Sequence, residues 1–266
     1  MIGLYDVSAG YNGIEVLHNV SFEIKENGIY VLLGKNGSGK TTTLRVIAGI
    51  LPIFKGKIKR EGTIGYLSHS LALPPEMTVR ESLKFFSEIL GGDPNNVIDK
   101  FQLQEILDKR ISDLSQGQKK RLSIAKVFVK NYDIYLFDEP TGNLDPVLAS
   151  EIRKMIVSLS KNKIIIYTSH NLYEAREIGN YVMVISNGRL MLFKPMHEIS
   201  LKEYFIGIRA SEDLSKILNG EYQGDYFVVK VNDPSEVNSI IQKLVERNIK
   251  ILEIKEMKNP LEDLLG

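Results

Sequence analysis

The segment from Gly34 to Thr41 reads GKNGSGKT, and it constrains the fold of this chain more than any other stretch. It satisfies every position of the phosphate-binding pattern G-x-x-x-x-G-K-[ST]. The apolar residues 28–33 predict a buried strand before it, and residues 41–48 predict a helix after it. Glycines let successive N–H groups turn inward, and a helix N-terminus adds partial positive charge. We therefore expect a nucleoside triphosphate at this loop.

Each residue of the loop has an expected role. Lys40 is expected to contact the β and γ phosphates, and the Thr41 hydroxyl is expected to reach Mg²⁺. The alternative is a glycine-rich turn that holds a lysine by chance, and the flanking strand and helix argue against it. The expected nucleotide-binding residues are Gly34, Lys35, Asn36, Gly37, Ser38, Gly39, Lys40, Thr41 and Thr42.

A second apolar strand, residues 134–139, ends in two carboxylates. An acid at the end of a strand beside a phosphate loop lies where Mg²⁺ needs a second protein contact, so Asp138 is the expected ligand. Glu139 is expected to accept a proton from the water that attacks the γ-phosphate. Taken alone, the pair would be an ordinary solvated strand end. The phosphate loop makes the functional interpretation the stronger one.

A third buried strand, residues 163–170, ends at His170. The carboxyl ends of parallel strands converge on the ligand in open α/β sheets. His170 is therefore expected to hydrogen-bond the γ-phosphate or the attacking water. A lone histidine is more often a structural hydrogen-bonding residue, but its place at a strand end favours the functional role.

Two further segments admit both a functional and a structural interpretation. Tyr11 lies in the turn of a predicted hairpin within residues 1–25, where an exposed ring can stack on a base. Alternatively, it packs beside its own hairpin. Ser115 and Gly117 begin a predicted helix and form a second helix N-terminus suited to phosphate. Ordinary helix capping is the alternative there.

Composition excludes several classes of site. The 266 residues contain no cysteine, which excludes disulfides and thiol catalysis, and the four histidines lack metal-ligand spacing. Mg²⁺ carried by the nucleotide is therefore the expected metal. The net charge of +1 and the lack of a basic block give no sign of nucleic-acid binding. No apolar run is long enough to span a bilayer, so we expect a soluble cytoplasmic protein.

The spacing of apolar residues changes twice along the chain. Helical patterns fill residues 70–130, with Thr78 and Glu81 in capping-box register and further helices at 97–107 and 118–129. From residue 201 onward, strands at 204–208, 226–231 and 249–254 alternate with helices at 211–218 and 235–247. We therefore predict an α/β core with an N-terminal antiparallel β-subdomain, an inserted helical subdomain and a small C-terminal α+β appendage.

Residues 1–200 resemble the nucleotide-binding subunit of an ABC transporter, a P-loop NTPase with a RecA-like core. Besides the phosphate loop, the resemblance rests on Tyr11, the signature segment 114–118, residues 138–140, the loop 141–145 and His170. It implies ATP as the nucleotide, Tyr11 as the adenine-stacking residue and a head-to-tail homodimer or pseudo-dimer that encloses two ATP molecules. Ser115, Gly117, Gln118 and Asp145 would then contact the nucleotide of the other subunit.

The resemblance also implies partners and a location. The helical subdomain would face an integral membrane permease, which places the chain as a peripheral protein at the cytoplasmic face of the membrane. The ending 259–265 resembles ATPases of ABC-2 exporters, so export is expected, although an ordinary stabilising tail has nearly equal weight. The alternatives are an importer ATPase and a soluble ABC-type ATPase of nucleic-acid maintenance or complex assembly.

Two residues depart from the family pattern. His69 follows the strand where family members have a glutamine that senses Mg²⁺ and relays nucleotide state, and imidazole suits hard Mg²⁺ poorly. The role expected for His69 is therefore to relay the nucleotide state to the partner protein, without binding Mg²⁺. Gln116 stands where glycine is commoner, and this change is expected to matter little because Ser115 and Gly117 are intact.

Overall fold

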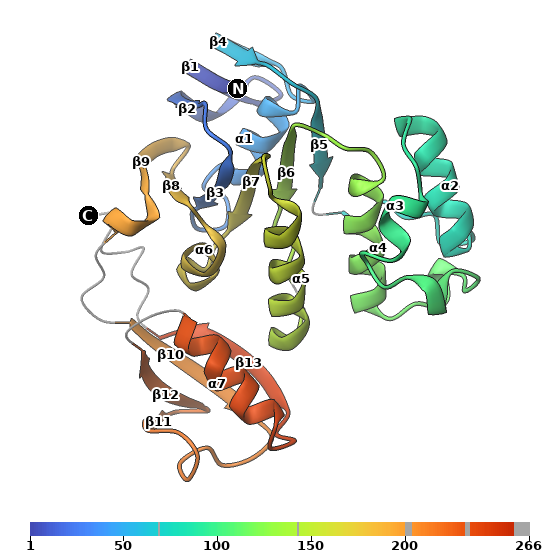
Figure 1. The fold of residues 1–266 in the computed structure, drawn as a ribbon. Coiled ribbons are helices and arrows are strands. Elements are labelled where there is room, and N and C mark those ends of the chain that lie inside the picture. Colours follow the sequence, from blue (N-terminus) through green and yellow to red (C-terminus); the bar gives the residue numbers. More distant parts are fainter. Residues whose placement is uncertain (69, 143, 200–203, 232–234, 258–266) are drawn as a thin grey trace.

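A six-stranded sheet forms the centre of the molecule (Figure 1). The structure is a computed structural model that describes residues 1–68, 70–142, 144–199, 204–231 and 235–257. Its strand order is β5-β6-β7-β3-β8-β9. Neighbours from β5 to β8 pair in parallel, and β9 pairs antiparallel to β8. The strands are β3 Gly28–Leu33, β5 Ile64–Leu67, β6 Ile134–Asp138, β7 Ile164–Ser169, β8 Tyr181–Ser186 and β9 Arg189–Pro195.

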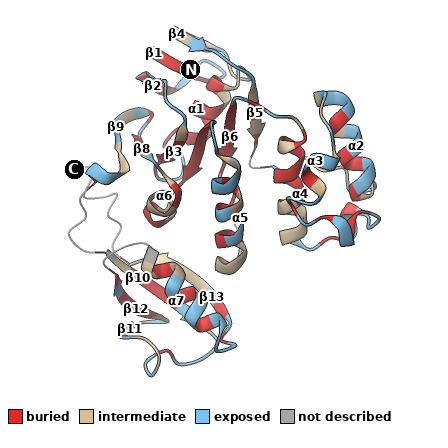
Figure 2. Ribbon diagram, in the orientation of Figure 1, coloured by how far each residue is buried: buried red, intermediate tan, exposed pale blue. Residues whose placement is uncertain are grey.

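The central strands are buried on both faces, as Figure 2 shows in red. Successive side chains of a strand point to opposite faces, so Ile29 and Val31 lie in one hydrophobic cluster and Tyr30 and Leu32 in another. The first cluster is completed by helices α4, α5 and α6, and the second by α1 and the N-terminal strands. The prediction of parallel strands with two buried faces is confirmed. The helix bounds are α1 Lys40–Ile47, α4 Gln116–Phe128, α5 Pro146–Leu159 and α6 Leu172–Ile178.

The N-terminal subdomain is an antiparallel sheet in the order β2-β1-β4. The predicted hairpin is present as β1 Ile2–Tyr11 and β2 Ile14–Ile24. The third strand is β4 Ile53–Arg60, and it contains a glycine, a residue that by local pattern favours a turn. Gly56 instead lies inside the strand with φ +94°, where the register with β1 shifts. A Cβ there would lie 2.5 Å from the Asp6 carbonyl oxygen, so the close backbone approach requires glycine.

The helical segment contains α2 Val79–Leu90, α3 Asn95–Ile98 and α4, joined by two single 3₁₀ turns. The capping box of Thr78 and Glu81 is confirmed. The continuous helix predicted over 97–107 is wrong, because α3 ends at Ile98 and Gln102 takes φ +51°. This reversal lets Phe101 and Leu103 both become fully buried. Burial of these side chains therefore overrides the helical periodicity.

The C-terminal unit, residues 204–231 and 235–257, is a four-stranded antiparallel sheet with one helix on a face. The α+β prediction is confirmed, but the helix expected at 211–218 is absent from this unit. Asp213 instead accepts hydrogen bonds from Ser215 N and Oγ and from the Tyr222 hydroxyl, which favours a turn over a helix. The elements are β10 Tyr204–Ala210, β11 Glu221–Gln223, β12 Tyr226–Val231, α7 Ser235–Val245 and β13 Ile251–Glu256.

The C-terminal unit packs against α5 and α6 of the core. Its hydrophobic cluster includes Tyr173 of α6, and Val147 of α5 packs against it. None of the helices in the described residues is long and apolar enough to cross a membrane.

Candidate phosphate-binding and catalytic site

The segments that follow β3, β6 and β7 meet at the carboxyl edge of the parallel sheet. They line a groove of about 560 Å³, which we call the phosphate-loop groove. The predicted meeting of these strand ends is therefore observed, while the chemical roles of the side chains stay predictions. The groove is lined by Val16, Asn36, Gly37, Gly39, Lys40, Thr41, Thr42, Asp138, Glu139, Gly142 and His170.

Lys40 begins helix α1 and is 5% exposed, with its ammonium held inside the loop. Its Nζ donates to the carbonyl oxygens of Gly34 at 2.8 Å and of Lys35 at 3.2 Å. Gly39 supplies the turn into the helix with φ +110°, a conformation in which side chains are strained. The cation is thereby fixed at the floor of the groove.

Thr41 and Asp138 face one another although they are 97 residues apart in sequence. The Thr41 hydroxyl donates to Asp138 Oδ1 at 3.1 Å, and the Thr168 hydroxyl donates to the same oxygen at 3.0 Å. Tyr66 approaches the other oxygen at 3.5 Å. A hydroxyl and a carboxylate are hard oxygen donors, which suits Mg²⁺.

Glu139 combines an uncommon backbone conformation with two charged-group contacts. It takes φ +47°, uncommon for a residue with a side chain, and its N–H donates to the Thr168 hydroxyl at 2.9 Å. Its Oε1 lies 3.4 Å from Lys40 Nζ and 3.9 Å from His170 Nδ1. The nearby His170 is the main cause that lowers the pKa of Glu139 to about 2; Lys40 acts in the same direction, and burial opposes the shift. Glu139 in turn raises the pKa of His170. The Glu139 carboxylate is therefore ionised beside the Lys40 ammonium and the His170 ring.

Thr168 and Lys120 hydrogen-bond the two acids and were not predicted as site residues. Thr168 bonds both Asp138 and Glu139, as described above. Lys120, on the buried side of α4, donates from Nζ to the Glu139 carbonyl oxygen at 3.2 Å. Burial lowers the pKa of Lys120, and Asp138 and Glu139 act in the opposite direction. Thr168 adjoins the strand end already singled out, whereas nothing local marks Lys120, since a lysine on a helix is normally solvated.

The other predicted side chains lie elsewhere. Tyr11 ends β1 instead of lying in the turn, and it is 36% exposed. Its hydroxyl accepts a hydrogen bond from Arg45 Nη1 of α1 at 3.1 Å, so the ring is anchored beside the loop helix. Tyr11 does not line the phosphate-loop groove. His69 lies outside the described residues, and its coupling role stays a prediction.

The signature segment caps helix α4. The Ser115 hydroxyl accepts from Gln118 N at 3.2 Å, and Gln118 Oε1 accepts from Ser115 N at 3.0 Å. Asp145 caps α5 in the same manner by accepting from Leu148 N. A Cβ on Gly117 would lie 2.4 Å from Leu148 Cδ2, so glycine lets the two helix starts pack together. None of Ser115, Gly117, Gln118 and Asp145 lines the phosphate-loop groove of its own chain.

The loop fits a bound phosphate on two further grounds. The buried hydroxyl of Ser38 has no hydrogen-bond partner among the described residues. A Cβ built on Gly37, at φ +81°, would meet nothing within 4 Å, so open space adjoins the loop backbone. A polar hydrogen-bonding group and open space beside a fixed lysine match the needs of an anionic oxygen ligand.

Comparisons with known proteins agree with this geometry. A family model described as ABC transporter matches residues 17–142. The ABC transporter ATP-binding protein MJ1023 of Methanocaldococcus jannaschii is 32% identical over 200 residues, which span 72% of this chain and 76% of that protein. Among solved structures, cbiO1 from Clostridium perfringens, part of the ABC transporter complex cbiONQ, has a TM-score of 0.67 at 26% identity. That match covers 74% of this chain and 89% of cbiO1.

Other relatives are named for opposite directions of transport. The cytochrome c biogenesis ATP-binding export protein CcmA of Ruegeria pomeroyi is 39% identical over 142 residues, covering 53% of this chain and 70% of that protein. The sn-glycerol-3-phosphate import ATP-binding protein UgpC of Cereibacter sphaeroides is 32% identical over 207 residues, covering 70% of this chain and 59% of that protein.

Proposed function

The chain belongs to the family of ABC transporter ATP-binding proteins, and from this premise we propose that it drives a separate integral membrane permease. Members of the family bind ATP and are ATPases, so the phosphate-loop groove is the place where hydrolysis occurs. The observation that carries the proposal is the convergence of Lys40, Asp138, Glu139 and His170 on this one groove.

The groove performs hydrolysis through its own charged side chains. Lys40 is paired with Glu139, and the phosphates of ATP offer the lysine a stronger anionic partner. The carboxylate of Glu139 is then free to accept the proton of the attacking water, while His170 stays within reach of the same point. Thr41 and Asp138 would hold Mg²⁺, which neutralises charge on the phosphates when bound.

Two copies are proposed to act together. Ser115, Gly117, Gln118 and Asp145 do not line the groove of their own chain, yet they gather at two adjacent helix N-termini. A helix N-terminus favours a phosphate oxygen. A head-to-tail homodimer would bring these residues to the ATP held by Lys40 of the second copy, with Tyr11 stacking on its adenine.

The membrane partner is proposed to contact the helical subdomain, about residues 70–130. Helix α2 exposes Phe85 and Ile89 there, at 39% and 63% of their surfaces. This contact would hold the chain at the cytoplasmic face of the membrane. We further propose an ATPase domain of residues 1–200 and a C-terminal domain of residues 201–266.

Export is the proposed direction, and import is the second candidate. The similarity to CcmA favours export and the similarity to UgpC favours import. The exporter-like ending, residues 259–265, lies outside the described residues.

The test is Glu139→Gln, with Glu61→Gln as the matched control, since Glu61 is 57% exposed and pairs with Lys59. Losing the general base should lower ATP turnover by about 10²–10⁴-fold. The Glu139→Gln variant should still bind ATP and should accumulate as a dimer in gel filtration. When purified from native membranes, it should co-purify with an integral membrane protein. Unchanged turnover would refute the role of Glu139, and an ATP-bound monomer would refute the dimer. Recovery with nucleic acid in place of a membrane protein would favour the soluble alternative.

A further inference from the structure

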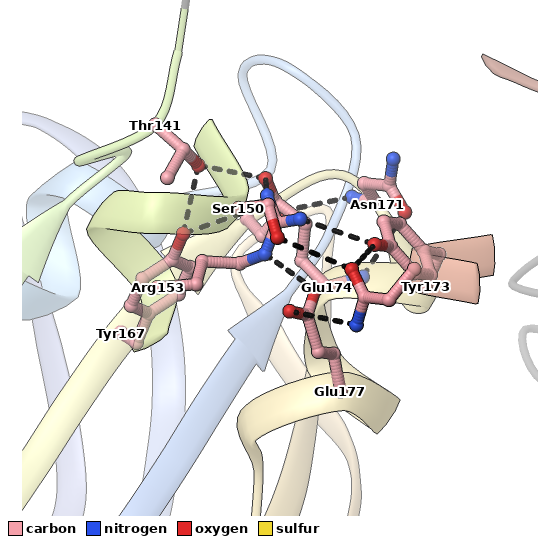
Figure 3. Close-up of polar contacts among 10 residues, drawn as sticks. Thr141, Ser150, Arg153, Tyr167, Asn171, Tyr173, Glu174 and Glu177 are labelled. Atoms are coloured by element: carbon pink, nitrogen blue, oxygen red, sulfur yellow. Dashed lines mark hydrogen bonds and ion pairs between the residues drawn. The ribbon is translucent and has the colours of Figure 1, made fainter. Parts of the chain in front are cut away.

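A chain of largely buried polar contacts, drawn in Figure 3, links the segments next to the phosphate-loop groove to the C-terminal unit. It begins at the two segments that carry the catalytic pair and ends on helix α7. We call this chain the Glu174 network. Its members are Thr141, Ser150, Arg153, Tyr167, Ser169, Asn171, Tyr173, Glu174, Glu177 and Asn238.

Glu174 of α6 joins the two catalytic segments. Its Oε1 accepts from the Thr141 hydroxyl at 2.7 Å, and its Oε2 accepts from the Ser169 hydroxyl at 2.6 Å. An ionised carboxylate only accepts, so both hydroxyls donate, and the protonated Tyr167 hydroxyl is left to donate to Thr141 Oγ1 at 2.7 Å. One carboxylate therefore fixes two loops that are far apart in sequence.

These two loops carry Glu139 and His170. Thr141 lies two residues after Glu139, and Ser169 immediately precedes His170. The side chain of His170 is 60% exposed, so its position depends on the backbone that precedes it. Ser169 Oγ also accepts from Asn171 N at 3.0 Å, which pins the turn on the other side of His170. A shift of Glu174 would thus change the separation of Glu139 and His170.

Arg153 of α5 holds Glu174 in place. It is 2% exposed and donates to Glu174 at 3.1 Å, to Glu177 at 2.5 Å and to the Tyr173 hydroxyl at 3.1 Å. The guanidinium is a planar fork with five N–H donors, so one side chain can bind both acids in a fixed geometry.

Asn238 of α7 completes the network from the C-terminal unit. Its Nδ2 donates to Glu177 Oε1 at 3.2 Å. Its Oδ1 accepts from the hydroxyls of Tyr173 at 3.1 Å and Ser150 at 3.2 Å. All three contacts cross from the C-terminal unit to helices α5 and α6 of the core.

We propose that Glu174 is a positioning residue for hydrolysis and that the C-terminal unit sets its geometry through Asn238, Glu177 and Arg153. Docking of α7 on the core would thereby control how well Glu139 and His170 are aligned. The part of this inference that concerns turnover rests on the proposed function. The mechanical link is independent of it and is measurable without ATP.

The first experiment measures hydrogen exchange by mass spectrometry in the full-length chain, without nucleotide. Asn238→Ala removes the three contacts, and Asn238→Asp keeps the acceptor oxygen but repels Glu177. The matched control is Gln242→Ala, an exposed amide of the same helix that donates to Glu246. Peptides over 138–142 and 167–171 should exchange roughly tenfold faster in both Asn238 variants, the effect of losing one hydrogen bond to a charged group. The phosphate loop, residues 34–41, should exchange at the wild-type rate.

Unchanged exchange in both catalytic peptides would overturn the link. Equal acceleration of the phosphate loop would also overturn it, because that result indicates general loosening of the fold. Neither outcome depends on whether the chain hydrolyses ATP.

The second experiment is a double-mutant cycle on ATP turnover. Asn238→Ala should lower kcat roughly tenfold with KM for ATP unchanged, since the network touches neither Lys40 nor Thr41. In a Glu174→Gln background the same substitution should have little further effect, because the path to Thr141 and Ser169 is already broken. Independent, additive losses would refute transmission through Glu174. A wild-type chain without turnover would refute the proposed function and leave the exchange result to decide the link.

Discussion

Replacing Arg153 by methionine tests how much the buried charges of the Glu174 network contribute to stability. Methionine keeps much of the aliphatic volume but removes the donors to Glu174, Glu177 and Tyr173. The two carboxylates are only 13% and 9% exposed, so they would remain as buried anions beside each other. Breaking a buried ion pair by removing one partner destabilises proteins by about 3–5 kcal/mol.

The expected loss of stability in Arg153→Met follows from this geometry. Arg153 serves two acids at once and also lies 5.2 Å from the Tyr173 ring, which favours the middle or upper part of that range, about 4 kcal/mol. In a chain of this length, each kcal/mol lowers the melting temperature by about 2–4 °C. Arg153→Met should therefore melt roughly 10 °C below the wild type, as measured by calorimetry and by urea unfolding.

Arg209→Met is the matched control. Arg209 pairs with Glu253 at 2.9 Å, but the side chains are 46% and 41% exposed. Exposed pairs contribute about 0.2–1 kcal/mol, so this variant should melt within roughly 3 °C of the wild type. If Arg153→Met is no less stable than Arg209→Met, burial does not amplify the Arg153 interactions and our reasoning about the network is wrong.

Two other predictions concern the groove and the signature helix. Gly117→Ala places a Cβ 2.4 Å from Leu148 Cδ2, and overpacking should cost about 1–3 kcal/mol in urea unfolding; a neutral change would show that Leu148 moves aside freely. The pKa of Glu139 is lowered from 4.5 to about 2, so its ionised form stabilises the fold above pH about 4.5, and this contribution is lost as the pH falls toward 2. The stability deficit of Glu139→Gln should therefore shrink between pH 6 and pH 3, whereas a constant deficit would contradict the assignment.

Local signals allowed much of the fold to be predicted from sequence. The glycine loop, the capping box of Thr78 and the doubly buried strands depend on residues a few positions apart, and each appears where it was expected. The errors arose where distant contacts decide the local conformation. The segment 97–107 breaks because Phe101 and Leu103 both reach the core, and residues 211–218 form a turn around Asp213.

The candidate site divides in the same way. The phosphate loop, the two acids at the end of β6 and the histidine after β7 could be predicted from local patterns, because each lies at the end of a recognisable strand. Three side-chain pairings became visible only in the folded chain: Lys40 pairs with Glu139, Lys120 bonds the Glu139 carbonyl oxygen, and Asn238 bonds Glu177 beside Arg153. The physical reason is that side-chain pairing across elements depends on strand order and helix packing. These are set by burial over the whole chain, and no short pattern encodes them.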